Sequence, residues 1–178
     1  MGTQNYICKP SSTGFSWTLF GPQATLFVTF KLFGNEIQQQ IATHFLSANP
    51  AENGMARPTW QSSLDTSAVW GKASLISTDT AYVAPGAIPW LLVQVVGAQR
   101  GPAGGAMLMP ATYIHRLNTS GGVAPSTGCT ISTDTGNTAL VPPNERFSAS
   151  ELVYVEFKRL RNARFGNPEI NVIGKAVQ

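Results

Sequence analysis

Charged side chains are scarce in this sequence. Lys, Arg, Asp and Glu together make up 12% of the 178 residues, about half the usual share for a globular protein. Apolar residues, at 43%, are too frequent for an intrinsically disordered chain, which combines low hydrophobicity with high net charge. The remaining surface must be built from Thr, Ser, Asn and Gln, which is typical of β-rich extracellular domains.

The few basic residues do not form the pattern expected of a nucleic-acid-binding protein. The net charge is +3, and Lys158, Arg159, Arg161, Arg164 and Lys175 are confined to the last part of the chain. A nucleic-acid groove needs a stripe of positive charge across the fold. No nucleic-acid partner is therefore expected, and a solvated basic end is the simpler interpretation.

Long apolar runs are also absent. The longest, IPWLLVQVV from Ile88 to Val96, contains Pro89 and Gln94 and is about half the length of a membrane-spanning helix. The opening residues, MGTQNYIC, have neither the basic nor the apolar region of a signal peptide. We expect no transmembrane segment and, for an exported protein, a chain from which the signal peptide has been removed.

Histidine and acidic residues are too few to form an obvious catalytic or metal site. The two histidines, His44 and His115, share no ligand spacing, whereas zinc needs three or four ligands. Neither G-x-S-x-G nor a phosphate-binding glycine motif occurs, and aspartates such as Asp65 in SLDTS suit Asx-type turns. The sequence predicts no metal and no cofactor, and His44, Asp65 and His115 remain as candidates for a catalytic role.

Two cysteines, Cys8 and Cys129, lie far apart in the sequence. Their spacing excludes an ordinary zinc cluster and a C-x-x-C redox site. Either both are buried free thiols or they form one long-range disulfide. The charge-poor, Ser- and Thr-rich composition favours the disulfide, because disulfides persist in oxidising compartments.

Turn signals recur at short intervals along the chain, and alternating apolar runs such as ATLFVTFKLF lie between them. This pattern predicts an all-β fold, a single-domain antiparallel β-sandwich or barrel with at most one short helix. The domain is expected to span residues 1–157, and residues 158–178 to form a basic tail or an extra strand.

One segment, EIQQQIATHFLSA, fits two structures. Ile37, Ile41 and Phe45 recur every four residues, which favours an amphipathic helix. The preceding Gly34-Asn35 follows a strong strand pattern and suits a hairpin turn, which favours a returning strand.

Several stretches resemble one family: YIC near the start, RPTWQSSLDTSAVWG, and AIPWLLVQVVGAQRGPAGGAMLMPATYIHRLNTSGGVAPSTGC. The chain is similar over about residues 6–142 to secreted bacterial and fungal proteins grouped as domain of unknown function 3455. The resemblance implies an exported all-β domain with one cysteine near the mature N-terminus and another in the GC segment. These positions are Cys8 and Cys129 here, which supports the disulfide.

The family pattern also favours a strand for Ile37 to Phe45. In the same way, YIHRLNTSGGVAPSTGC is interpreted as a strand, a glycine turn and a loop that delivers Cys129 to Cys8. His115 and Arg116 would then point to opposite faces of the sheet. The family has no established activity, so the resemblance implies no catalytic residue.

Two functional hypotheses follow. The first is a non-catalytic secreted or cell-surface domain that binds a polymer, a protein partner or copies of itself, with Trp60 and Arg116 as candidate binding residues. The second is an extracellular hydrolase of unrecognised type with a cleft near His44, Trp60 and Asp65. The scarcity of histidine and acidic residues favours the first hypothesis.

Overall fold

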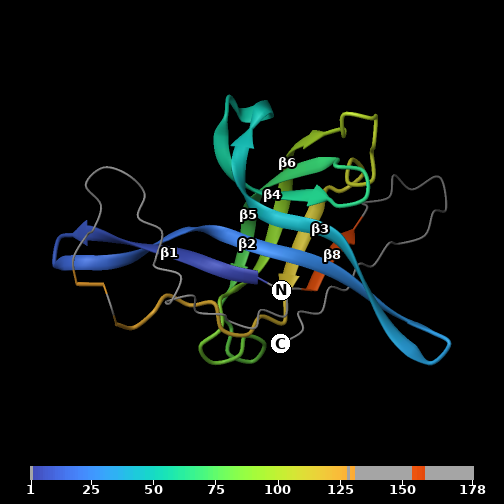
Figure 1. Cartoon of the computed structure of the whole chain (residues 1–178). Helices are drawn as coiled ribbons and strands as arrows, with labels where there is room; N and C mark the ends of the chain where they lie inside the picture. The colour runs from blue at the N-terminus through green and yellow to red at the C-terminus, as the bar shows by residue number, and fades with distance from the viewer. Residues whose placement is uncertain (1, 128, 131–153, 159–178) are drawn as a thin grey trace.

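The computed structural model describes residues 2–127, 129–130 and 154–158, which form one antiparallel sheet (Figure 1). The eight strands are adjacent in chain order, and the sheet is not closed. The one helical element in these residues is a 3-10 turn, η1 (Pro50–Glu52). The all-β prediction is therefore confirmed. The strands are β1 (Gly2–Ser11), β2 (Gly14–Leu32), β3 (Asn35–Asn49), β4 (Met55–Ser62), β5 (Ala68–Ser77), β6 (Trp90–Gln99), β7 (Tyr113–Leu117) and β8 (Tyr154–Lys158).

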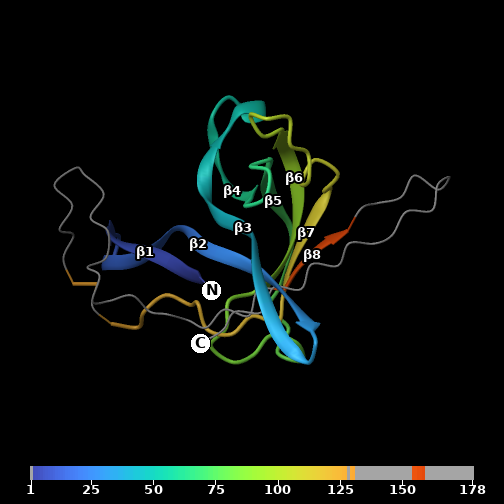
Figure 2. The same ribbon diagram turned by 45° about the vertical axis from the view of Figure 1, so that its right-hand side comes forward.

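The longest strand, β2, takes part in two hairpins. Its first half pairs with β1 as far as Gly2 opposite Ala24, and its second half pairs with β3 as far as Leu32 opposite Asn35. Figure 1 shows that the two hairpins extend to opposite sides of the molecule. Figure 2 shows β4, β5 and β6 gathered above them.

A small core forms where apolar side chains of neighbouring strands pack together. Trp60 lies opposite Val69, and Val93 lies opposite Ile114. A Cβ atom on Gly71 would collide with Val93 and with the ring of Trp60, so glycine at this position lets the indole lie across β5. The buried core cluster consists of Leu26, Ala42, Trp60, Val69, Val93, Leu108 and Ile114.

The ambiguous segment is a strand, as the family pattern favoured. β3 runs through all of it and pairs with β2 and β4. A spacing of four returns to the same face of a strand as well as of a helix, so the periodicity alone did not separate the two. The turn falls one residue earlier than expected, at Phe33-Gly34, where φ is 49° and 81°. Two positive φ values in a two-residue hairpin are characteristic of a type I′ turn.

The last strand that the structure describes is β8, and the predicted domain boundary after residue 157 stays a prediction. β8 pairs with β7 from Tyr113 opposite Lys158 to Leu117 opposite Tyr154. Of the expected tail, residues 158–178, the structure describes Lys158 at the end of β8, and residues 159–178 lie outside the described residues. In the part of the chain that the structure describes, no helix has the length and apolar character needed to cross a membrane.

Candidate functional site

His44 lies on the same face of the sheet as Trp60. The two residues are opposite each other on β3 and β4, and their rings stack with centroids 4.1 Å apart and planes 15° from parallel. Nδ1 of His44 lies 2.9 Å from the carbonyl oxygen of Thr59. Desolvation by burial lowers the pKa of His44 to about 4, partly opposed by the Thr59 contact, and the nearby charge of Arg116 lowers the pKa further. The imidazole is therefore neutral at physiological pH.

Asp65 forms the Asx-type turn expected from its sequence context. Oδ1 accepts hydrogen bonds from the backbone N–H (3.1 Å) and hydroxyl (2.7 Å) of Ser67, and Oδ2 accepts one from the N–H of Met107 at 2.7 Å. The Met107 bond, followed by that of Ser67, holds the pKa of the Asp65 carboxyl well below its usual range. A Cβ on Gly105 would collide with Asp65. The carboxylate thus fastens the loop before Met107 to the β4–β5 turn.

Arg116 lies close enough to His44 for its charge to act on the imidazole, whereas Asp65 is held in a different set of contacts. None of the hydrogen bonds of Asp65 within the described residues reaches His44. His115 and Arg116 are neighbours on β7, so their side chains point to opposite faces, as expected. Arg116 donates from Nε and Nη2 to the carbonyl of Pro89, at 3.2 and 2.8 Å. Trp60 is 5% exposed. The catalytic and binding roles suggested for these residues stay predictions.

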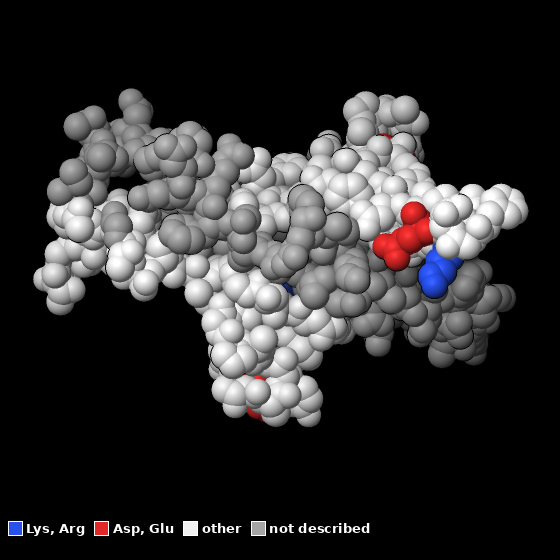
Figure 3. Space-filling view, turned by 60° about the horizontal axis from the view of Figure 1, so that its bottom comes forward, with Lys and Arg blue, Asp and Glu red and all other residues white. Residues whose placement is uncertain are grey.

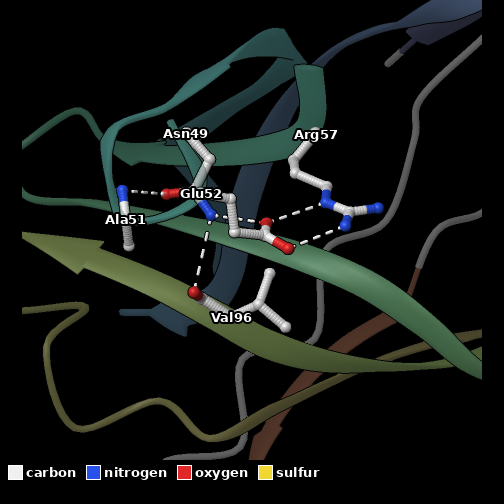
Figure 4. A network of polar contacts seen from close by, with 5 residues as sticks. All are labelled: Asn49, Ala51, Glu52, Arg57 and Val96. Carbon is white, nitrogen blue, oxygen red and sulfur yellow. Dashed lines mark hydrogen bonds and ion pairs between the residues drawn. The ribbon is translucent and has the colours of Figure 1, made fainter. Parts of the chain in front are cut away.

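A polar network joins the β3–β4 connection to β6 (Figure 4). Arg57 holds Glu52 with two parallel bonds, Nε to Oε2 at 2.8 Å and Nη2 to Oε1 at 2.7 Å. The buried Asn49 donates to Oε2 of Glu52 at 2.7 Å and to the carbonyl of Val96 at 3.4 Å, and it accepts from the N–H of Ala51. The Arg57 bond is the main reason that the pKa of Glu52 falls to about 2.

This network was not predicted, because NPAENGMARP has the composition of an ordinary polar loop. The one signal available in the sequence was the spacing of Asn49 and Glu52, which resembles a capping pattern. On β6, Gly97 leaves room for the side chain of Asn49, because a Cβ atom at position 97 would collide with it.

The predicted disulfide is present. The sulfurs of Cys8 and Cys129 are 2.07 Å apart, and 121 positions separate them in the sequence. Two hydrogen bonds also join the β1–β2 hairpin to the loop before Cys129. The Tyr6 hydroxyl donates to the carbonyl of Gly122 at 2.7 Å, and Nε1 of Trp17 donates to the carbonyl of Thr127 at 3.0 Å. The loop before Cys129 is thereby fixed across the β1–β2 hairpin.

The far part of the β2–β3 hairpin exposes apolar side chains. We call the six residue pairs from Phe27 opposite Gln40 to Leu32 opposite Asn35, with their turn, the β2–β3 ribbon. Phe30 and Leu32 are 41% and 45% exposed, and Phe33 in the turn is 95% exposed. A phenylalanine with positive φ is uncommon, because its Cβ crowds the backbone there. Such outliers are a reason to look for function.

Metal ligands are not gathered at any of these places. Within residues 2–127, 129–130 and 154–158, no three His, Cys, Asp or Glu side chains lie close enough to hold an ion.

Comparison with known proteins identifies a family. No curated protein and no solved structure matches the chain. The family model described as "Protein of unknown function (DUF3455)" matches residues 1–140, which include every strand from β1 to β7 and both cysteines. The chain therefore belongs to this family, as its motifs indicated.

Proposed function

We propose that this protein is an exported, non-catalytic binding domain that acts through the exposed apolar side chains of the β2–β3 ribbon. The observation that carries the proposal is the exposure and backbone conformation of Phe33. It is 95% exposed in a turn whose φ of 49° suits Asn or Gly much better than Phe. An apolar side chain kept at a strained and fully exposed position is better explained by contact with a partner than by folding.

The state of the polar candidates supports the same conclusion. His44 is packed on Trp60, and the three hydrogen bonds to Asp65 hold two loops together. Each side chain already has a structural role that accounts for its position. In addition, few charged atoms are visible on the described part of the face drawn in Figure 3.

Export is supported by the disulfide. Cys8 and Cys129 are joined, and such bonds form and persist outside the reducing cytosol. We place the protein in the extracellular space or at the cell surface. Intact-mass analysis of protein isolated from its native compartment tests this placement: the oxidised mass should predominate, and two free thiols would contradict export.

The binding role is tested by retention on immobilised probes. The purified chain is passed over cellulose, chitin, peptidoglycan and a resin that carries the same chain. We expect retention on at least one of these matrices and its loss in the variant Phe30→Ser/Leu32→Ser/Phe33→Ser. Leu75→Ser/Ile76→Ser is the matched control, because both residues are 65% exposed but lie on β5. Equal behaviour of the parent and the ribbon variant would contradict the proposal.

The alternative is an extracellular hydrolase that uses His44 as a base. It is favoured by the neutral imidazole beside Trp60, since only a neutral histidine can accept a proton. A pKa of about 4 makes it a weak base, however. Turnover of chromogenic ester and glycoside substrates that disappears in His44→Gln, with the fold intact, would replace the binding proposal with this one.

A further inference from the structure

We propose that the β2–β3 ribbon binds the same ribbon of a second copy of the chain, with the outer edges of the two β2 strands paired antiparallel. The inference rests on the proposed binding function of the ribbon and names its partner.

The ribbon has only two strands in the part of the chain that the structure describes. β1 accompanies β2 as far as Gly2 opposite Ala24, and β4 accompanies β3 only from Ser62 opposite Ala42. Beyond these positions no described strand lies beside either outer edge, so the backbone N–H and C=O groups there face away from the ribbon. A two-stranded ribbon is marginally stable alone, and such edges are templates for further pairing.

The open edges decide which kind of partner fits. Exposed Phe30, Leu32 and Phe33 alone would also suit a lipid surface. Insertion into hydrocarbon would leave the outward backbone groups without hydrogen-bond partners, at several kcal/mol for each group. A β-strand satisfies those groups and covers the apolar side chains at the same time. A strand is therefore the better occupant.

The two edges of the ribbon differ in composition. The β2 edge reads FVTFKL and the β3 edge reads NEIQQQ. β-branched and aromatic residues favour strand pairing, whereas a row of exposed glutamines offers little apolar surface to bury. The β2 edge is therefore the one to be covered.

The turn determines which backbone groups of β2 point outward and can pair with a second copy. In a two-residue hairpin the closing pair, here Leu32 and Asn35, exchanges hydrogen bonds. Pairs alternate from there, so the backbone groups of Phe27, Thr29 and Lys31 point away from β3. Two copies related by a two-fold axis at Thr29 then place Lys31 opposite Phe27 of the second copy, so the two lysines do not face each other.

Thr29 provides an independent observation. Its hydroxyl is buried and has no hydrogen-bond partner in the part of the chain that the structure describes. On the proposed axis Thr29 lies opposite Thr29 of the second copy, and Thr–Thr is a favourable cross-strand pair. In the same register Leu32 reaches Leu26 of the second copy, close to where β1 begins to pair at Ala24. The second strand thus fills most of the uncovered length of β2.

Light scattering coupled to size exclusion, from low micromolar to near-millimolar concentration, tests the proposal on the full chain. We expect the parent to reach twice the chain mass. Thr29→Pro removes an outward N–H from the β2 edge and should raise the dissociation constant at least about 100-fold. Gln38→Pro is the matched control, because Gln38 faces Thr29 across the ribbon but lies on the β3 edge. It should leave the dimer unchanged.

A second measurement covers the case in which Thr29→Pro does not fold. Thr29→Cys should give a covalent dimer on mild oxidation, because residues facing each other at the axis are within disulfide reach, and Gln38→Cys should not. A monomeric parent at all concentrations, a dimer that survives Thr29→Pro, or mass growing beyond two copies would each overturn the proposal. A monomeric parent whose matrix retention still depends on the ribbon would overturn self-pairing and leave the binding function standing.

Discussion

The ring of His44 stacks on the indole of Trp60, with ring centroids 4.1 Å apart. The two residues face each other across β3 and β4, so the contact belongs to the pairing of the strands. A histidine that is neutral and enclosed in this way makes the stability of the fold depend on pH.

The first prediction concerns that dependence. The pKa of His44 is about 4 in the folded protein against 6.5 for the free side chain. Because the unfolded chain binds the proton more tightly, the stabilisation is complete above about pH 6.5 and is lost as the pH falls towards 4. The difference amounts to about 3 kcal/mol. Denaturant unfolding between pH 7 and 4 should show a smaller decline in His44→Gln than in the parent. His115→Gln is the control and should behave like the parent; the same slope in all three proteins would contradict the assignment.

A second prediction tests the network around Asn49. Asn49→Ala removes the bond to Ala51 and leaves the Glu52 carboxylate and the Val96 carbonyl short of a donor. We expect a loss of about 1–3 kcal/mol in the free energy of unfolding. Asn35→Ala, at an exposed position beside the ribbon turn, is the control and should change stability by less than about 0.5 kcal/mol. Equal effects would show that Asn49 does not connect β6 to η1.

A third prediction concerns Asp65. Asp65→Asn keeps one accepting oxygen for Ser67 but turns an amide N–H₂ towards the N–H of Met107, where two donors repel. The amide of Met107 should exchange with solvent at least about tenfold faster, and proteolysis should begin in the loop before it. Asp79→Asn is the matched control, since Asp79 accepts from Ala81 in another turn. Unchanged exchange at Met107 in Asp65→Asn would refute the role of the carboxylate.

The lowered pKa of Asp65 adds a pH test. The carboxylate is favoured in the folded state, so its contribution is complete above the ordinary pKa of aspartate and is lost as the pH falls below it. Protection of the Met107 amide should therefore decrease under acidic conditions in the parent, while Asp65→Asn should show no such decrease.

A fourth prediction addresses the disulfide. Cys8→Ser/Cys129→Ser should lower the free energy of unfolding by about 2–5 kcal/mol, because the bond closes a long loop. Trp17, which donates to Thr127 in that loop, should become more accessible to acrylamide quenching. The parent treated with reductant should converge on the same stability and quenching. A reduced parent as stable as the oxidised one would contradict the prediction.

A fifth prediction follows from the strain at Phe33. Phe33→Asn creates the Asn-Gly pair preferred in type I′ turns and should stabilise the ribbon by about 1 kcal/mol. Amide exchange in Phe30 and Ile37, which face each other in the ribbon, should slow accordingly. Phe33→Ala removes the ring without supplying a residue suited to positive φ, so it should give no such protection. Faster exchange in Phe33→Asn would show that the phenylalanine stabilises its own turn.

The predictable parts of this fold were those fixed by local pattern. Alternation and turn residues indicated the all-β architecture, and the Asx turn at Asp65 followed from its neighbours. The exact turn between β2 and β3 was missed by one residue, because Phe33 occupies a conformation that sequence rules reserve for Gly or Asn.

The parts that depend on distant contacts were not predictable. The sequence around Asn49 does not predict its hydrogen bond to Val96. A single glycine such as Gly97 does not predict that the side chain of Asn49 packs against it. The stacking of His44 on Trp60 depends on a register that the hydrophobic pattern alone does not set. Even the disulfide was one of two alternatives until the family motif was taken into account.

The separation of the two cysteines has a consequence for biogenesis. During synthesis Cys8 emerges with the first strand, and Cys129 follows 121 positions later, after β2 to β7 have all been made. The disulfide cannot form before these strands have been synthesised, so closure of the loop is a late step in the maturation of the chain.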